Sequence, residues 1–100
     1  MDTSLIVTAC ATARPGCEAQ LLALARALVA PTRAEAGCLG YRLYQQQDAA
    51  GCRLQFIEEW ASREHLDAHT RTAHLQAFLA DSAALLAAPL EIAMLHEVTG

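Results

Sequence analysis

The side chains best suited to proton chemistry lie between Glu58 and Phe78. His69 carries an imidazole, which titrates near neutral pH and can accept a proton from a phenolic hydroxyl or orient a substrate oxygen. Glu58 places a carboxylate on an otherwise apolar strand face, where it must be hydrogen-bonded or functional. We predict that His69 and Glu58 are the catalytic residues. The structural alternatives are a His69 ring that only bridges a helix break, and a Glu58 carboxylate bonded to His69 or to a backbone amide.

Aromatic side chains and a second histidine would form the walls of a pocket for a flat ligand. Trp60 shares a face with Glu58, because side chains alternate along a strand, and it offers a broad aromatic surface. His74 would stack over Phe78, four residues later in a helix. Core packing is the alternative for each of these residues. We predict substrate-binding roles for Trp60, His74, Tyr41, Phe56 and Phe78.

No metal site is predicted from the sequence. His65 and His69 have the i, i+4 spacing that can bind zinc, but no third ligand is evident in regular geometry, and a helix break separates them from His74. We expect His65 to face solvent. The cysteines form no C-x-x-C motif, which argues against a zinc ribbon or a thioredoxin-like site.

The elements that must position these residues follow from periodicity and from start and stop signals. Pro31 must split the first helix, since it lacks an N–H donor, and Gly37 suits a left-handed cap. Ser62 and Thr72 are plausible N-caps, and Pro89 stops the last helix. In chain order we predict a strand at Leu5–Thr12, a broken helix from Cys17 to Gly37, a strand at Cys38–Gln47, a hairpin connection at 48–51, a strand at Arg53–Trp60, helices at Ser62–His69 and Thr72–Ala87, and a strand at Leu90–Val98.

This βαββαβ order predicts one α+β domain over residues 1–100 with a ferredoxin-like fold. Right-handed crossovers turn the order into a four-stranded antiparallel sheet with its helices on one face. The other face carries too many apolar side chains to stay exposed to water, so we expect a twofold homodimer.

The composition excludes several classes of partner. The net charge is −4, and the seven cations, all arginine, are scattered from Arg14 to Arg71, which argues against nucleic acid. No apolar run reaches the roughly 18 residues of a membrane span, and Met1–Ser4 lacks the features of a signal peptide. We therefore expect a cytoplasmic protein, and the absence of lysine and asparagine suggests a GC-rich bacterial genome.

The sequence resembles the antibiotic biosynthesis monooxygenase family over nearly its whole length. Members of that family read E-x-W, then a short acidic helix ending in L-x-A-H, then T-x-H and an aromatic residue. The matching pieces here are Glu58-Glu59-Trp60, Leu66-Asp67-Ala68-His69, Thr72-Ala73-His74 and Phe78, preceded by Arg14-Pro15-Gly16 and by the run from Glu35 to Tyr41.

The resemblance implies a dimeric α+β barrel with a pocket between helices and sheet in each subunit. It also implies a small monooxygenase that oxidises a quinol- or anthrone-type aromatic with dioxygen and needs no flavin, haem or metal cofactor. Some relatives use an asparagine near the first strand, and this chain has none, so their site cannot be transferred here. A non-catalytic dimeric module that binds a small metabolite, and an isomerase of a small oxygenated metabolite, are the alternatives.

Overall fold

The computed structural model describes residues 4–48 and 51–98. Its elements are β1 (Leu5–Thr12), α1 (Glu18–Ala27), α2 (Val29–Arg33), β2 (Cys38–Asp48), β3 (Gly51–Trp60), α3 (Arg63–Thr70), α4 (Ala73–Ser82), a 3₁₀ turn η1 (Ala83–Leu85) and β4 (Glu91–Leu95). The predicted order and the ferredoxin-like α+β class are confirmed. The predicted turn between β2 and β3 falls largely on residues 49–50, which lie outside the described residues.

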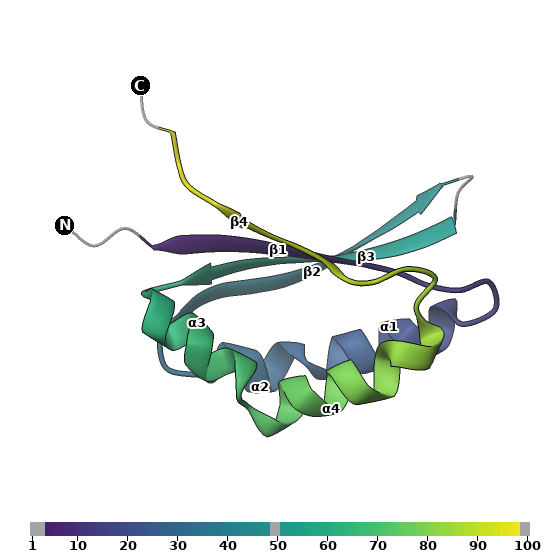
Figure 1. Cartoon of the computed structure of the whole chain (residues 1–100), viewed down its shortest axis with the longest axis horizontal. Helices are drawn as coiled ribbons and strands as arrows, with labels where there is room; N and C mark the ends of the chain where they lie inside the picture. The colour runs from purple at the N-terminus through teal and green to yellow at the C-terminus, as the bar shows by residue number, and fades with distance from the viewer. Residues whose placement is uncertain (1–3, 49–50, 99–100) are drawn as a thin grey trace.

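The four strands form one antiparallel sheet in the order β2-β3-β1-β4. All the helices lie against one face of the sheet and leave the opposite face bare (Figure 1). Tyr41 of β2 and Val7 of β1 both pair with Glu58 of β3, so the three side chains share the face that is turned toward the helices. This face holds the core, where Leu54, Phe56 and Trp60 are buried.

The helix boundaries follow from capping and from proline. The first helix breaks after Ala27, because Pro31 has no N–H to donate to the carbonyl of Ala27. Ser62 caps α3 by accepting from the backbone N–H of His65 at 3.2 Å, and Thr72 caps α4 by accepting from that of Leu75 at 3.3 Å. Both predicted caps are therefore confirmed. No helix within the described ranges is long and apolar enough to cross a membrane.

Three predicted elements are longer than those observed. The broken first helix was expected to close at Gly37, but α2 ends at Arg33 and Ala34 is its C-cap. The last helix was expected to reach Ala87, but its α-helical part ends at Ser82. Beyond that point the backbone is hydrogen-bonded to the residues at the end of β1. Arg14 N–H donates to the carbonyl of Leu85, and Ala87 N–H donates to that of Thr12. The last strand was expected at Leu90–Val98 but covers Glu91–Leu95, since its neighbour β1 begins only at Leu5.

Gly37 lies where no side chain fits. Its φ of +78° is in the left-handed region, and a Cβ there would overlap the ring and Cβ of His65. His65 is not turned to solvent as predicted, because its Nδ1 is hydrogen-bonded to Ser62 Oγ at 2.8 Å and its ring is held against Gly37. The turn between α2 and β2 is thereby fixed against the start of α3.

Gly37→Ala is expected to destabilise the fold more than Gly16→Ala. Both positions have positive φ, so both variants carry a backbone cost of about 1–2 kcal/mol. Gly16 has open space where a Cβ would stand, whereas Gly37→Ala adds overlap with His65, worth about 1–3 kcal/mol more. Urea unfolding of the two variants measures the difference, and equal losses would show that His65 does not hold this turn.

Candidate active site: a histidine–glutamate pair beside an apolar cavity

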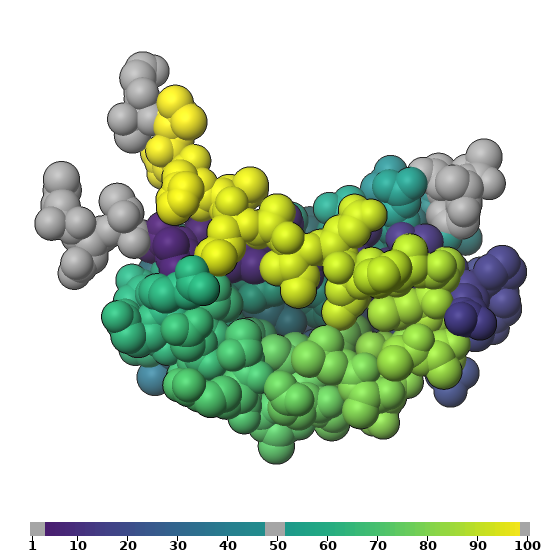
Figure 2. All heavy atoms as spheres, viewed as in Figure 1, coloured from purple at the N-terminus to yellow at the C-terminus, as the bar shows by residue number. Residues whose placement is uncertain are grey.

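A cavity of about 220 Å³ lies between the helix-side face of the sheet and helices α3 and α4. Figure 2 shows the molecule hollowed between the yellow β4 segment and the green helices. Most of the lining is apolar, and Glu58 and His69 bring a carboxyl and an imidazole into it. The lining residues are Val7, Ala9, Leu28, Tyr41, Phe56, Glu58, Leu66, His69, Thr70, Leu75, Gln76, Phe78, Leu79, Leu90 and Ile92.

His69 stands in the last turn of α3, on the face turned toward the sheet, and is only 3% exposed. Its ring stacks on Trp60 with the ring centroids 4.7 Å apart, and it meets Tyr41 edge-on at 5.9 Å. The backbone carbonyl of His69 accepts from the N–H and from the hydroxyl of Thr72. The ring is therefore held by aromatic packing, and the backbone that carries it is held by the bonds from Thr72.

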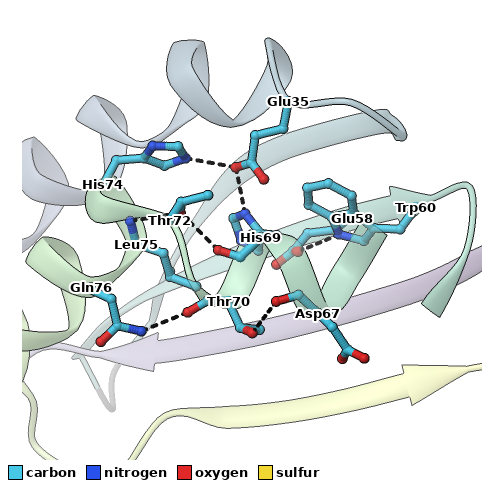
Figure 3. A network of polar contacts seen from close by, with 10 residues as sticks. All are labelled: Glu35, Glu58, Trp60, Asp67, His69, Thr70, Thr72, His74, Leu75 and Gln76. Carbon is cyan, nitrogen blue, oxygen red and sulfur yellow. Dashed lines mark hydrogen bonds and ion pairs between the residues drawn. The ribbon is translucent and has the colours of Figure 1, made fainter. Parts of the chain in front are cut away.

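Glu35 is the residue that the sequence-based prediction missed. It lies in the turn between α2 and β2, and one of its oxygens, Oε2, is 2.7 Å from Nδ1 of His69 and 2.7 Å from Nε2 of His74 (Figure 3). The Glu35 side chain is 13% exposed. One carboxylate oxygen thus joins two histidines that come from different helices.

This arrangement selects the tautomer of His69. A carboxylate accepts hydrogen bonds and cannot donate them, so the neutral form of the ring carries its hydrogen on Nδ1 and its lone pair on Nε2. Within the described part of the chain, Nε2 of His69 has no hydrogen-bond partner, and the ring lines the cavity. Through Nε2, the neutral His69 ring can offer a proton acceptor to a ligand in the cavity that it lines, and Glu35 on Nδ1 can stabilise the imidazolium that would form.

Glu58 is held by Trp60. The indole Nε1–H of Trp60 donates to Glu58 Oε1 at 3.0 Å, and no hydrogen bond joins Glu58 to His69 among the described residues. Burial raises the pKa of the Glu58 carboxyl above its ordinary value of 4.5, and the hydrogen bond from Trp60 and the nearby His69 offset only part of that effect. Glu58 is therefore a weaker acid than an exposed glutamate.

Glu58→Gln is expected to be more stable than the wild type at neutral pH. An acid whose pKa is higher in the folded state binds more protons folded than unfolded, so wild-type stability falls as the pH rises through that folded-state pKa. Glutamine keeps an acceptor for Trp60 but does not ionise. Urea unfolding from pH 4 to 8 tests this: the advantage of the variant should shrink toward acid pH. An advantage that is constant with pH would contradict the assignment.

Five of the predicted site residues line the cavity: His69, Glu58, Tyr41, Phe56 and Phe78. The ring of Phe56 packs against those of Tyr41 and Phe78, with centroids 5.4 and 5.9 Å apart, and so forms an aromatic wall. Burial, and secondarily the charge of Glu58, raises the pKa of the Tyr41 phenol well above its ordinary range, so its hydroxyl stays neutral.

Trp60 and His74 lie elsewhere than expected. Trp60 is fully buried behind His69 and Glu58 and does not line the cavity, so it supports the cavity wall without forming its surface. His74 makes no ring contact with Phe78 among the described residues, and its ring is directed to Glu35. Sequence reasoning also missed two polar lining residues, Thr70 and Gln76, which are joined by a 2.7 Å hydrogen bond from the Gln76 amide to the Thr70 carbonyl.

The comparisons with known proteins agree with this fold. Residues 4–81 match the family model described as "Antibiotic biosynthesis monooxygenase". A Synechocystis protein, "Uncharacterized protein sll1783", is 32% identical over 91% of this chain, and the chain spans 61% of the length of that relative. A Mycobacterium tuberculosis protein named "Putative monooxygenase Rv0793" is 38% identical over 82% of this chain and 79% of its own length.

Solved structures show the same architecture. The crystal structure of PA3566 from Pseudomonas aeruginosa superposes with a TM-score of 0.89 at 38% identity, covering 99% of this chain and 98% of the other. The structure of Rv0793 gives a TM-score of 0.87 at 34% identity, covering 98% of each chain. The fold, the matched residues and these relatives agree, and the chain belongs to the antibiotic biosynthesis monooxygenase family.

Proposed function

We propose that this protein is a cofactor-independent monooxygenase that oxidises a small quinol- or anthrone-type aromatic with dioxygen. The observation that carries the proposal is the pair formed by His69 and Glu35, which presents a proton acceptor to an apolar cavity. Such substrates need only to lose a proton before they react with dioxygen, so a buried base beside an apolar cavity meets the main requirement.

The cavity suits a small, flat substrate. Its volume of about 220 Å³ is below the roughly 300–1,000 Å³ of sites that hold drug-sized ligands. Phe56 and Phe78 would face the rings of the substrate, and His69 would meet its hydroxyl. Tyr41, with its neutral hydroxyl, would complete the wall beside His69.

The proposed reaction begins with transfer of the hydroxyl or enol proton to Nε2 of His69. The electron-rich anion then passes one electron to dioxygen, and the resulting radical pair combines to form a carbon–oxygen bond. The O–O bond of this peroxide breaks: one oxygen atom stays on the carbon as a carbonyl and the other leaves as water. That water carries the proton first held by His69 and the remaining hydrogen of the oxidised carbon, so the substrate loses four electrons and dioxygen gains them.

Glu35 and Glu58 have different roles in this scheme. Glu35 is a positioning residue, because it fixes the tautomer of His69 from behind the ring and does not line the cavity. Glu58 lines the same cavity as His69, so its carboxyl can contact the substrate directly. The Glu35 carboxylate would thus stabilise the protonated base while the anion reacts with dioxygen.

The test is oxygen consumption by the purified protein with a panel of anthrones and naphthohydroquinones that are kept reduced until mixing. The expected result is turnover above the spontaneous rate, with one molecule of dioxygen consumed per quinone product and no accumulation of hydrogen peroxide. Rates at the spontaneous background across the panel would overturn the proposal. Tight binding of an aromatic without chemical change would instead assign the alternative function, a metabolite-binding module that uses the same apolar cavity.

We also propose that two copies pair through the bare face of the sheet. Ile57, Tyr44 and Leu95 lie on that face and are 36%, 50% and 47% exposed. Light scattering should give the mass of a dimer for the wild type, and Ile57→Lys should shift it toward the monomer. A wild type that stays monomeric at high concentration would contradict the pairing. The cytoplasmic location and the bacterial origin stay predictions.

A further inference from the structure

We propose that Glu35, His69 and His74 form a binding site for a divalent transition-metal cation of the zinc type, and that an occupied site switches off the base function of His69. The first part is independent of the proposed monooxygenase activity. The second part rests on it. Sequence spacing offered His65 as a partner for His69, but His65 is held by Ser62, and the fold brings Glu35 to the remaining two histidines instead.

The three ligand atoms converge from separate segments of the chain. Glu35 Oε2 lies 2.7 Å from each of the two ring nitrogens, and the three atoms all lie within 4.8 Å of one another. Figure 3 shows both rings directed at the same carboxylate oxygen. Within residues 4–48 and 51–98, no other trio of histidine, cysteine, aspartate or glutamate side chains converges in this way.

The donor set selects the class of cation. Two imidazole nitrogens and one carboxylate oxygen are the ligands of zinc sites that keep a fourth position open, whereas Mg²⁺ and Ca²⁺ prefer oxygen alone. A ring nitrogen bonds a metal along the same in-plane direction in which it now directs its N–H. Zinc–ligand distances are about 2.0–2.2 Å. To reach them, the Glu35 carboxylate must draw back, which its rotatable side chain permits, and the rings of His69 and His74 must approach each other.

The three proposed ligands differ in their exposure to solvent. The His74 side chain is 28% exposed, that of Glu35 is 13% exposed and that of His69 is 4% exposed, so a cation would enter on the His74 side. The Thr72 cap joins the two helices that carry the histidines, because it bonds to the His69 carbonyl and to the Leu75 N–H. The two imidazoles are therefore held near each other without any cation.

Metal binding would reverse the tautomer of His69. A neutral imidazole that coordinates through Nδ1 carries its hydrogen on Nε2, so the hydrogen moves from one ring nitrogen to the other. The nitrogen that faces the cavity would then be a donor and no longer a proton acceptor. The same trio would serve as a catalytic base when empty and as an inhibited site when occupied.

The experiment titrates the metal-free protein with Co²⁺, Zn²⁺ and Mg²⁺. We expect one Co²⁺ per chain with the visible absorption of a four-coordinate ion, displacement of that ion by Zn²⁺, and no competition from Mg²⁺. His74→Ala and Glu35→Gln should each weaken binding at least about tenfold, whereas His96→Ala, which removes an exposed histidine outside the trio, should leave it unchanged. Unchanged affinity in both trio variants, or no absorption band, would overturn the site.

Two further measurements separate a loss of metal binding from a loss of folding, and neither depends on enzymatic turnover. Circular dichroism identifies a variant that fails to fold, in which case His74→Gln replaces His74→Ala. Nitrogen chemical shifts of His69 report its tautomer directly, and Zn²⁺ should move the hydrogen from Nδ1 to Nε2. Stoichiometric binding without that change would overturn the switch. Binding in a protein that shows no oxygenase turnover would leave the site intact and remove only the monooxygenase proposal.

Discussion

Replacing His69 by glutamine is expected to lower the turnover of a quinol or anthrone substrate by about 10²–10⁴-fold, the usual contribution of a positioned general base. Glutamine is close to histidine in length and can still bond to Glu35, but it has no titratable nitrogen to receive the substrate proton. The effect should fall on kcat more than on KM, because the aromatic wall that binds the substrate is unchanged. Initial rates of oxygen consumption measure it.

The control is His96→Gln, which changes an exposed histidine that does not line the cavity. Its rate should equal that of the wild type, and circular dichroism should show both variants folded. A His69→Gln rate within twofold of the wild type would mean that the proton goes to another group. Glu58 would then be the first candidate, because it also lines the cavity.

Replacing Trp60 by alanine is expected to cost about 3–5 kcal/mol of unfolding free energy through the lost packing alone. Trp60 is fully buried, and its indole packs against His69 and donates to Glu58. The same change leaves a buried carboxyl without its donor, at a further cost of about 1–3 kcal/mol. Since a domain of this size has about 5–15 kcal/mol in total, the variant should be close to unfolded at room temperature.

Trp60→Phe separates the two contributions. Phenylalanine keeps most of the packing but has no N–H, so only about 1–3 kcal/mol should be lost. Urea unfolding at one fixed pH measures both variants. Equal stability of Trp60→Ala and Trp60→Phe would show that the hydrogen bond to Glu58, rather than packing, accounts for the role of the tryptophan.

Local signals in the sequence were enough to predict the fold. Ser62 and Thr72 act through their own backbone neighbourhood, so both predicted N-caps are found where expected. Gly37 has the predicted left-handed φ, but it lies beyond the C-cap of α2, which is Ala34. Alternation along β3 likewise places Glu58 and Trp60 on one face. The end of the last helix was missed because the residues that end it, at the close of β1, are far away in sequence.

The candidate site could be predicted only in part, for a related reason. The residues from Glu58 to Phe78 lie within one stretch, so their types and spacing pointed to a shared cavity. Glu35 is 34 residues before His69, and no periodicity links the two. Alternation gives the face of a strand but not the depth, so it could not show that Trp60 packs on His69 and does not line the cavity.

The sequence separation of Glu35 from its two histidines has a consequence for folding. Glu35 follows the first crossover helix, whereas His69 and His74 belong to the second crossover, 34 and 39 residues later. Neither half of the chain contains the complete trio, so contacts of this range form only when both halves have docked. During refolding, the tautomer-specific nitrogen signals of His69 should therefore emerge with the final cooperative step, after the helices themselves have formed.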